Sequence, residues 1–306
     1  MSLRDKVLAT MKSKEIEGPF ELYVTRTPGY IWALFFRALH VHPIAVTLLS
    51  IVIGASSGYF FWMDDLRMNL IGMFLLIWAN WYDCADGQLA RMTGQKTLVG
   101  RLLDGLAGDI WFVCINLGLA IRMTTGWESI WVWILLAWAG LRCHARQCAI
   151  ADYYRNIHLY FQLGKSKSEL DSKTKQHARM AELRWDKEGW FEKLYLFFYS
   201  AYTKGQEDQA PAFQRLKQLI DCEYDGTLPE PQRQYFLAGS RPLMKWCNIM
   251  TFDARVGVLF ASLFAGLPWL YPVMESTIFE YIRFRTKRIH ERLCMDVLIQ
   301  LSKPQN

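Results

Sequence analysis

The stretch "DCADGQLARMTGQKTLVGRLLDGLAGD", from Asp83 to Asp109, is the most informative part of this sequence. It holds four aspartates, at positions 83, 86, 104 and 109. Apolar sequence lies on both sides, with "MNLIGMFLLIWANWY" before it and "IWFVCINLGLA" after it. Ionisable side chains are costly between helices that are apolar enough for a bilayer, so these four predict a functional site.

The composition favours a helical membrane protein. The chain has 306 residues, of which 52% are hydrophobic, and it contains 13 tryptophans. An alternative is a large soluble helical protein, but several long apolar runs end in Trp and Tyr, as membrane spans do. The run 43–63 carries no charge and is long enough for a span, which needs about 20 residues. We therefore expect an all-α polytopic membrane protein with six transmembrane helices, at 43–63, 68–91, 99–121, 127–150, 248–266 and 268–285.

The basic residues predict the orientation of these spans. With both termini inside, the outer connections carry only Arg67 and Arg122 as cations, and the inner side receives the other lysines and arginines. This is the positive-inside asymmetry, and it predicts cytoplasmic termini and a cytoplasmic active site, for example at a bacterial inner membrane. The run 256–274 can also form one span, but that would export the cluster "RFRTKRIHER". We therefore expect a turn at Pro268.

Several other protein classes are disfavoured. The N-terminus lacks the apolar core of a signal peptide. The seven cysteines are scattered and predict neither a disulfide framework nor a zinc site. A net charge of +6 fits the cytoplasmic loops of a membrane protein, so we expect neither DNA nor RNA as a partner.

The segment 153–247 is too long and too polar for an ordinary connection, and its pattern is helical. Trp190, Leu194, Phe197, Phe198 and Ala201 fall on one helical face. A helix lying on the membrane surface has such a face beside charged residues. A small helical cap that packs on the transmembrane bundle explains the pattern equally well. The predicted segments are 1–42 with an amphipathic helix at 28–42, 43–152 with spans one to four, 153–247 as a cytoplasmic insertion, and 248–306 with spans five and six and a basic tail.

The spacing of the first three aspartates predicts a metal site. Asp83 and Asp86 share a helical face. Asp104 lies on a second helix, joined to the first by the short loop "MTGQKT", so the three carboxylates converge. Close carboxylates repel one another, and oxygen-only ligands suit Mg²⁺ or Mn²⁺. Two such ions can clamp a phosphoryl or pyrophosphoryl group. The alternative is that these are surface acids beyond the helix ends.

These residues carry a family resemblance. The stretch resembles the signature of the CDP-alcohol phosphatidyltransferases, Asp-x2-Asp-Gly-x2-Ala-Arg-x8-Gly-x3-Asp-x3-Asp. "HPIAVTLLS" is similar to a Pro-Asn-x-x-Thr entry to the first span, with Ile44 in place of Asn. The resemblance covers roughly residues 28–152 and, more loosely, 248–290. Seven positions match the signature: Asp83, Asp86, Gly87, Ala90, Arg91, Gly100 and Asp104.

The fourth aspartate of the signature is displaced by one residue. Position 108 is Gly and Asp109 follows it. In an α-helix, residue i+5 is turned by about 140° from residue i, so Asp109 does not share the face of Asp104. A one-residue π-bulge would restore the alignment, and we expect one here. The alternative is that Asp109 lies outside the ring of metal ligands.

The resemblance implies a specific chemistry. Asp83, Asp86, Asp104 and Asp109 would bind two Mg²⁺ or Mn²⁺ ions, and Asp83, Gly87, Ala90, Arg91 and Gly100 would hold the CDP moiety. Asp109 would also be the catalytic base that takes the proton of an alcohol acceptor. The phosphatidyl group of CDP-diacylglycerol would pass to this polar alcohol, and CMP would leave. One alternative is transfer from CDP-choline or CDP-ethanolamine to a lipid alcohol, and another is a catalytically inactive membrane scaffold.

Two arginines near the inner end of the fourth span are candidates for the acceptor site. Arg142 and Arg146 are four residues apart, so both can face a phosphorylated acceptor such as an inositol or glycerol phosphate. Anchoring to lipid head groups explains them at least as well. Membrane lipids are expected partners in either case, and a homodimer is a further expectation.

Overall fold

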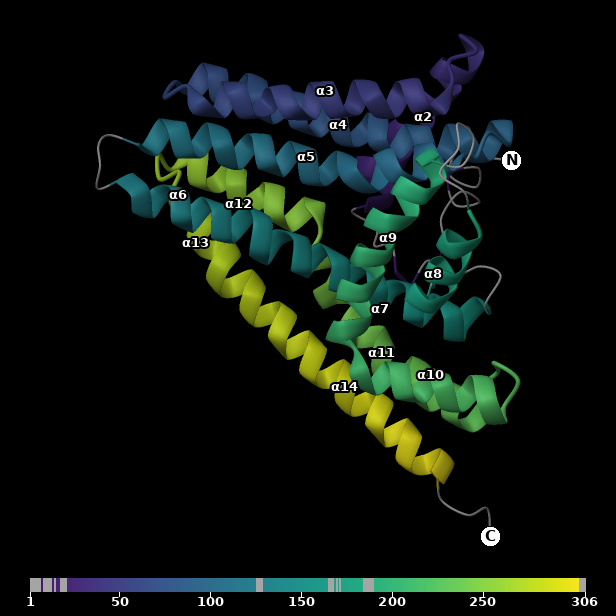
Figure 1. Cartoon of the computed structure of the whole chain (residues 1–306). Helices are drawn as coiled ribbons and strands as arrows, with labels where there is room; N and C mark the ends of the chain where they lie inside the picture. The colour runs from purple at the N-terminus through teal and green to yellow at the C-terminus, as the bar shows by residue number, and fades with distance from the viewer. Residues whose placement is uncertain are drawn as a thin grey trace. The chain divides into compact units, whose positions relative to one another are not determined.

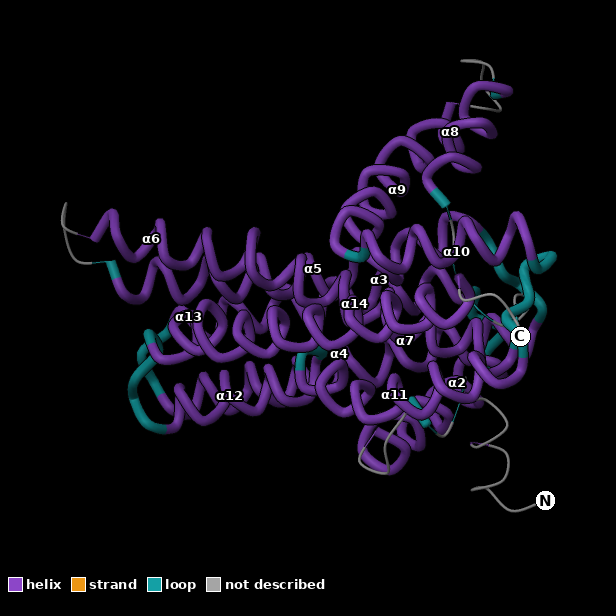
Figure 2. The backbone as a smooth tube through the Cα atoms, turned by 90° about the horizontal axis from the view of Figure 1, so that it is seen from below, coloured by secondary structure: helices purple, strands orange, loops and turns teal. Residues whose placement is uncertain are grey.

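The computed structural model describes residue 7, residue 13, residues 15–16, 21–124, 129–164, 168, 170, 172–183 and 190–302. Every regular element in these ranges is helical, and Figure 2 shows helices joined by loops. The all-α prediction is therefore confirmed for the described residues. The predicted N-terminal segment 1–42 is described from residue 21 onward, with most of residues 1–20 outside these ranges, and part of the outer connection, at 125–128, also lies outside them.

Packing divides the chain into two compact units. Unit 1 comprises residues 1–145 and 255–276, and unit 2 comprises residues 146–254 and 277–306. Each unit therefore combines distant parts of the sequence. The predicted division into four segments follows the membrane topology instead of the packing, and it stays a prediction.

Unit 1 is built on three long helices that lie side by side (Figure 1). They are α3 (Pro43–Trp62), α4 (Leu66–Thr93) and α5 (Leu98–Met123), and the shorter η1 (Glu21–Arg26) and α2 (Thr27–Ala38) pack against α4. The unit also holds α6 (Ile130–Ala137), η3 (Trp138–His144), most of α12 (Phe252–Phe264) and α13 (Leu270–Met274).

Local sequence sets the ends of α4 and α5, and these ends position the aspartates. The Asp65 side chain accepts hydrogen bonds from the N–H groups of Arg67 and Met68 at the start of α4. Gly94 ends the helix in the left-handed conformation, with φ of 71°. The Thr97 hydroxyl then accepts from the Gly100 N–H, 3.0 Å away, and starts α5. The four-residue connection makes α4 and α5 antiparallel neighbours, as the sequence predicts.

Glycines allow α3 and α5 to approach backbone to backbone. A Cβ atom at Gly58 would lie 2.4 Å from the Cys114 carbonyl oxygen, and one at Gly118 would lie 2.1 Å from the Gly58 carbonyl oxygen. One turn before Gly58, a Cβ at Gly54 would lie 2.4 Å from the Trp111 ring. Small residues four apart are the usual device for close contact between membrane helices. Here they join two helices of the same chain.

Three stretches are long and apolar enough to cross a membrane, namely Pro43–Trp62, Val99–Met123 and Glu230–Phe264. They support the membrane prediction, and the six-span topology stays a prediction. The expected turn near Pro268 is present, because α12 ends at Phe264 and α13 begins at Leu270. Beyond it, α13, η5 (Glu275–Phe279) and α14 (Glu280–Ser302) form one continuous helical run.

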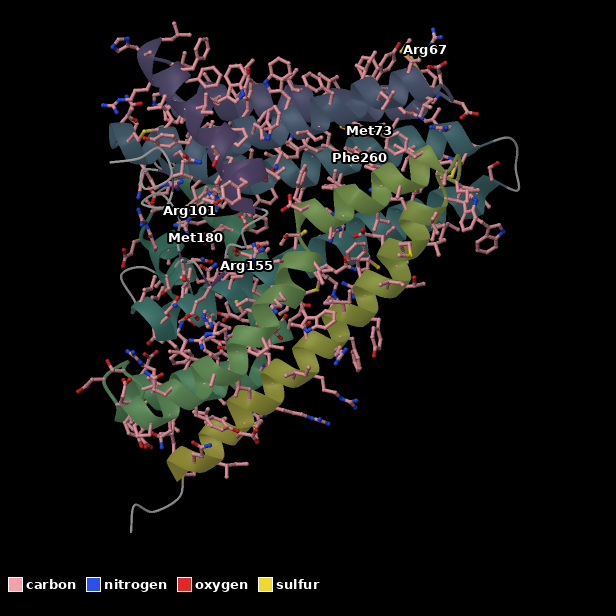
Figure 3. The ribbon with its side chains drawn as sticks, turned by 180° about the vertical axis from the view of Figure 1, so that it is seen from behind. Arg67, Met73, Arg101, Arg155, Met180 and Phe260 are labelled. Atoms are coloured by element: carbon pink, nitrogen blue, oxygen red, sulfur yellow. The ribbon has the colours of Figure 1, made fainter. Side chains whose placement is uncertain are left out.

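Unit 2 contains α7 (Ala145–Leu163), α8 (Lys173–Glu182), α9 (Trp190–Gln209), α10 (Pro211–Glu223), α11 (Glu230–Ile249) and most of η5 and α14. Its core includes a stack of Tyr154 on His290, with ring centroids 3.9 Å apart. Burial lowers the pKa of His290 to about 3, so this ring is neutral. Arg155, labelled in Figure 3, ties α7 to Asn248 through an Nε to Oδ1 hydrogen bond of 3.1 Å.

The aromatic face predicted within the insertion lies on α9 and is exposed. The side chains of Phe197 and Phe198 are 59% and 58% accessible, and Trp190 is also exposed. On the opposite side of α9, Thr203 is buried and accepts a hydrogen bond from Gln176 of α8 at 2.9 Å. The membrane-surface interpretation and the cap interpretation of this segment both stay predictions.

Candidate functional site

Three of the four predicted aspartates meet in unit 1. Asp83 and Asp86 come from the second half of α4, and Asp104 comes from the second turn of α5. Each offers a carboxylate oxygen, and these oxygens all lie within 4.8 Å of one another. We call this group the three-aspartate cluster. Arg101 lies at the same end of the helix pair, while Arg67 marks the other end (Figure 3).

Burial differs within the cluster. Asp86 is 3% accessible, Asp83 is half-buried and Asp104 is exposed. Among the described residues, Asp83 Oδ1 and Asp86 Oδ2 are buried without a hydrogen-bond partner. Buried carboxylate oxygens without a donor are costly, because charge that leaves water needs compensation. The donor set consists only of carboxylate oxygens, which are the ligands of hard divalent cations. The residues present therefore fit Mg²⁺ or Mn²⁺.

Neighbouring residues of the signature surround this cluster. The hydroxyl of Thr47 in α3 donates to the Pro43 carbonyl at 3.2 Å and lies close to the Asp86 carboxylate, so the entry motif of the first span reaches the acids. The Arg91 guanidinium lies over Gly87, where a Cβ would be 3.5 Å from Nη1. At Gly100 a Cβ would lie 3.0 Å from the Thr97 hydroxyl, so this glycine keeps the start of α5 compact. Ala90 lies on α4, between Gly87 and Arg91, and is half-buried.

Asp109 departs from the sequence-based expectation. Helix α5 is a regular α-helix from Leu98 to Met123, so the expected π-bulge is absent. Gly105 and Gly108 would each have open space around a Cβ, so close packing does not force a distortion there. Regular geometry turns Asp109 away from Asp104, and its Oδ1 lies 3.7 Å from His144 Nε2. The prediction of the bulge was wrong, and the role of Asp109 as a metal ligand stays a prediction.

The comparisons with known proteins agree with the signature. Residues 40–163 match the family model of the CDP-alcohol phosphatidyltransferases. The chain carries a CDP-alcohol phosphatidyltransferase domain. Members of this family are phosphotransferase-type enzymes that act in membranes and use divalent metals, CDP-alcohol donors and alcohol acceptors. The chain matches no curated protein and no solved structure.

A second group of ionisable residues extends from the transferase domain into the C-terminal part of unit 1. Arg255 of α12 and Glu275 of η5 form a fully buried ion pair, with 0% and 1% of their side chains accessible. Arg255 also bonds to His144 Nδ1, and its guanidinium carbon lies 5.7 Å from the centre of the Phe112 ring. We call Asp109, His144, Arg255 and Glu275 the mixed-charge network.

The network fixes the tautomer of His144. A guanidinium has only donors, so His144 Nδ1 must accept the hydrogen bond from Arg255. The proton of the neutral ring is then on Nε2, and Nε2 is the atom that faces Asp109. The side chain of Asp109 is 49% accessible. The network thus holds one accessible carboxylate beside a fixed N–H group.

Sequence reasoning missed Arg255 and Glu275. A signal was present, because each is a charged residue in an otherwise apolar run, "ARVGVLFASLF" and "LYPVMESTIF". Charged residues in such runs indicate functional sites by default. Their partners could not be inferred, since His144 is more than 100 residues away from both.

The two candidate acceptor arginines lie on either side of the boundary between the units. Arg142 belongs to η3 in unit 1 and is exposed. Arg146 belongs to α7 in unit 2, is half-buried, and has its charge near Glu280. An acceptor role and an anchoring role are both compatible with these positions.

Proposed function

We propose that the chain transfers a phosphatidyl group from CDP-diacylglycerol to a polar alcohol in a divalent-metal-dependent reaction that releases CMP. The three-aspartate cluster carries this proposal, because three carboxylates from two helices converge with two buried oxygens that have no donor. Bound divalent cations would neutralise the donor pyrophosphate and stabilise the leaving CMP. Asp83, Asp86 and Asp104 would hold these cations.

The remaining roles fall to residues of the domain. Arg91, exposed one turn after Gly87, is the proposed contact to the CDP phosphates, beside Ala90 and Gly100. Asp109 would take the proton of the acceptor hydroxyl, and His144 Nε2–H would hold its carboxylate in place. The acceptor oxygen then bonds to the phosphorus that carries the lipid, and the bond from this phosphorus to CMP breaks.

The proposed location is the cytoplasmic face of a bacterial inner membrane. Support comes from the cations near the cluster, since Arg91, Lys96 and Arg101 all lie on or between α4 and α5 at this end. Under this proposal Arg142 and Arg146 contact a phosphorylated acceptor. Arg146→Ala should then raise the KM for such an acceptor and leave the donor KM nearly unchanged, as steady-state assays would show.

The test is a transfer assay on the purified full-length chain. Labelled CDP-diacylglycerol, CDP-choline and CDP-ethanolamine would be offered with a panel of polar and lipid alcohols, in Mg²⁺, in Mn²⁺ and in EDTA. We expect CMP release from CDP-diacylglycerol that needs metal and is lost in Asp86→Asn. Asp64→Asn, at a side chain that is 86% accessible at the far end of α4, is the matched control.

Each other result has a defined meaning. Release that persists in EDTA would contradict the metal-dependent proposal. Transfer from CDP-choline or CDP-ethanolamine to a lipid alcohol alone would establish the alternative substrate pair. An absence of transfer from every donor, in protein that still binds Mn²⁺, would favour the inactive scaffold.

A further inference from the structure

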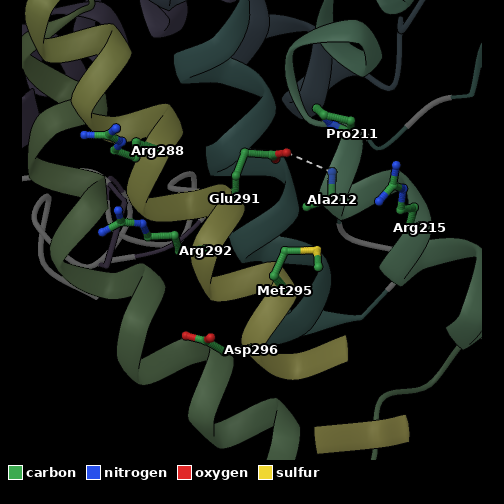
Figure 4. A pocket seen from close by; sticks show the side chains of 8 residues that line it. All are labelled: Pro211, Ala212, Arg215, Arg288, Glu291, Arg292, Met295 and Asp296. Carbon is green, nitrogen blue, oxygen red and sulfur yellow. Dashed lines mark hydrogen bonds between the residues drawn. The ribbon is translucent and has the colours of Figure 1, made fainter. Parts of the chain in front are cut away.

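Unit 2 contains a cationic cavity that the proposed transfer reaction does not use. It lies between α10 and α14, has a volume of about 480 Å³, and is shown in Figure 4. This volume is in the range of small-molecule sites. Both helices lie outside residues 40–163, which match the transferase family. The lining residues are Pro211, Ala212, Arg215, Arg288, Glu291, Arg292, Met295 and Asp296.

Three arginines line opposite sides of this cavity. Arg288 and Arg292 are one turn apart on α14 and project to the same side, and Arg215 of α10 lies beyond Glu291 and Met295 (Figure 4). All three are exposed. Within the described part of the chain, none of the three forms an ion pair with a carboxylate. Guanidinium groups without a carboxylate partner keep their N–H donors for an external anion, and this includes Arg288, which lies over the Phe284 ring at 5.8 Å.

The acidic residues of the cavity do not cancel this charge. Glu291 points away from Arg288 and Arg292, and its Oε2 accepts a hydrogen bond of 2.8 Å from the Ala212 N–H (Figure 4). That N–H belongs to the first turn of α10, where a carboxylate is favoured by the helix dipole. Glu291 therefore caps the helix end and lies within the field of Arg215, and Asp296 is the other acid of the lining, so the three arginines still outnumber the acids.

Apolar side chains lie beside the arginines on the accessible side of α14. Met295 lines the cavity, and Phe284, Ile289 and Ile299 are between 37% and 56% accessible. Basic residues mixed with exposed apolar ones suit a ligand that has both an anionic group and a hydrocarbon part. The forked N–H donors of arginine can bind two oxygens of one phosphate group, whereas the ammonium group of lysine acts as a point charge.

We propose that the cavity between α10 and α14 is a binding site for a phosphate-bearing anion, held by Arg288, Arg292 and Arg215. The phosphate is that of an anionic lipid head group or of a soluble phosphate compound. The site does not depend on the transfer reaction, so its test needs no activity. EDTA keeps the three-aspartate cluster free of metal, and a metal-free acidic cluster repels anions.

The experiment uses the full chain in neutral detergent with EDTA. One arm titrates inorganic pyrophosphate by calorimetry. The other arm counts bound phosphatidylglycerol, against phosphatidylcholine, by native mass spectrometry. We expect Arg288→Gln/Arg292→Gln to weaken binding by at least about tenfold, since two charge-assisted contacts are lost. Glu291→Gln, which removes an acid near the site, should bind as tightly as the wild type or more tightly.

Arg285→Gln is the matched control, because Arg285 lies on the same helix but stacks over Trp246 at 5.2 Å and does not line the cavity. Pyrophosphate binding alone would identify a soluble phosphate compound, and selective phosphatidylglycerol binding would identify a lipid head group. Binding of neither probe would overturn the proposal. So would wild-type affinity in the double variant, or an equal loss in Arg285→Gln. Met295→Glu, which adds an acid to the lining of the cavity, should also weaken binding and gives an independent test if the double variant misfolds.

Discussion

The two charged groups of unit 1 differ in the kinds of charge that they bring together. The three-aspartate cluster gathers three carboxylates, whereas the mixed-charge network sets two carboxylates against an arginine and a histidine. Asp104 belongs to the first and Asp109 to the second, although only five residues of α5 separate them. The comparison teaches that the cluster, which contains no cation of its own, fits an added one, whereas in the network Arg255 gives Glu275 a positive partner from within the protein. Asp109 is rotated by about 140° around the axis of α5 from Asp104, and this rotation places the two carboxylates in different groups.

The sharpest test of this difference is Asp109→Asn. If Asp109 is the base, the amide cannot accept the proton of the acceptor, and the transfer rate should fall by roughly 10²–10⁴-fold. Metal binding should survive, because Asp83, Asp86 and Asp104 are intact, and this is measured by Mn²⁺ titration.

A companion variant addresses the position of this base. Gly108→Asp combined with Asp109→Gly moves the carboxylate onto the face of Asp104, because α5 has no bulge. Activity equal to that of Asp109→Asn is expected if the base must face His144. Wild-type activity in Asp109→Asn would remove Asp109 from the mechanism.

The next largest effect is expected at the buried ion pair. Glu275→Gln leaves the Arg255 charge buried without its carboxylate, which should lower the free energy of unfolding by about 3–5 kcal/mol. The control is Asp64→Asn, since Arg122 keeps its hydrogen bonds to Phe61 O and Asn69 Oδ1. Unfolding in detergent measures both variants. A change below about 1 kcal/mol in Glu275→Gln, as for a surface pair, would show that the network is not balanced by this ion pair.

The cluster should respond to metal, and the network should not. At about 100 times its Kd, Mn²⁺ should stabilise the wild-type protein by about 2.7 kcal/mol. In Asp86→Asn this gain should disappear, while the metal-free variant should be at least as stable as the metal-free wild type, because one repulsive charge is gone. Melting curves with and without EDTA test both statements. Destabilisation of metal-free Asp86→Asn would mean that the cluster is balanced by the protein itself.

The smallest effect is expected at His144, which we treat as a positioning residue. His144→Phe removes the N–H donor and should lower kcat by roughly tenfold to a hundredfold, as loss of a supporting hydrogen bond does. His144→Gln keeps an N–H donor near Asp109 and should lower kcat by less. The KM for the CDP donor should stay unchanged in both variants. Equal kcat values for the two would show that the ring, and not its N–H group, is what matters.

Much of the cluster could be predicted from the sequence because its geometry is local. Asp83 and Asp86 share a helical face by spacing alone, and the four-residue connection between α4 and α5 brings Asp104 opposite them. The same logic failed at Asp109. The signature suggested a bulge, but α5 has room to stay regular, and a partner from η3 is present where the regular helix points Asp109.

The mixed-charge network could not be predicted for a different reason. Arg255 and Glu275 meet His144 only through tertiary packing, across more than 100 residues of intervening chain. The arginine cavity is similar, since Arg215 and Arg288 come from two helices with no motif in common. The helical spacing of Phe213, Leu216 and Ile220 matches the buried face of α10, where all three are at most 1% accessible.

The glycine contact between α3 and α5 bears on how this chain can assemble. In single-span proteins a pair of glycines four residues apart is a common surface for pairing two copies. In this chain Gly54 and Gly58 are covered by Trp111 and Cys114 of α5. That surface is therefore buried in a contact within one protomer. A homodimer, if it forms in the membrane, must be built on another face of the helices, and substitutions at these glycines would disturb the protomer before they disturb its oligomeric state.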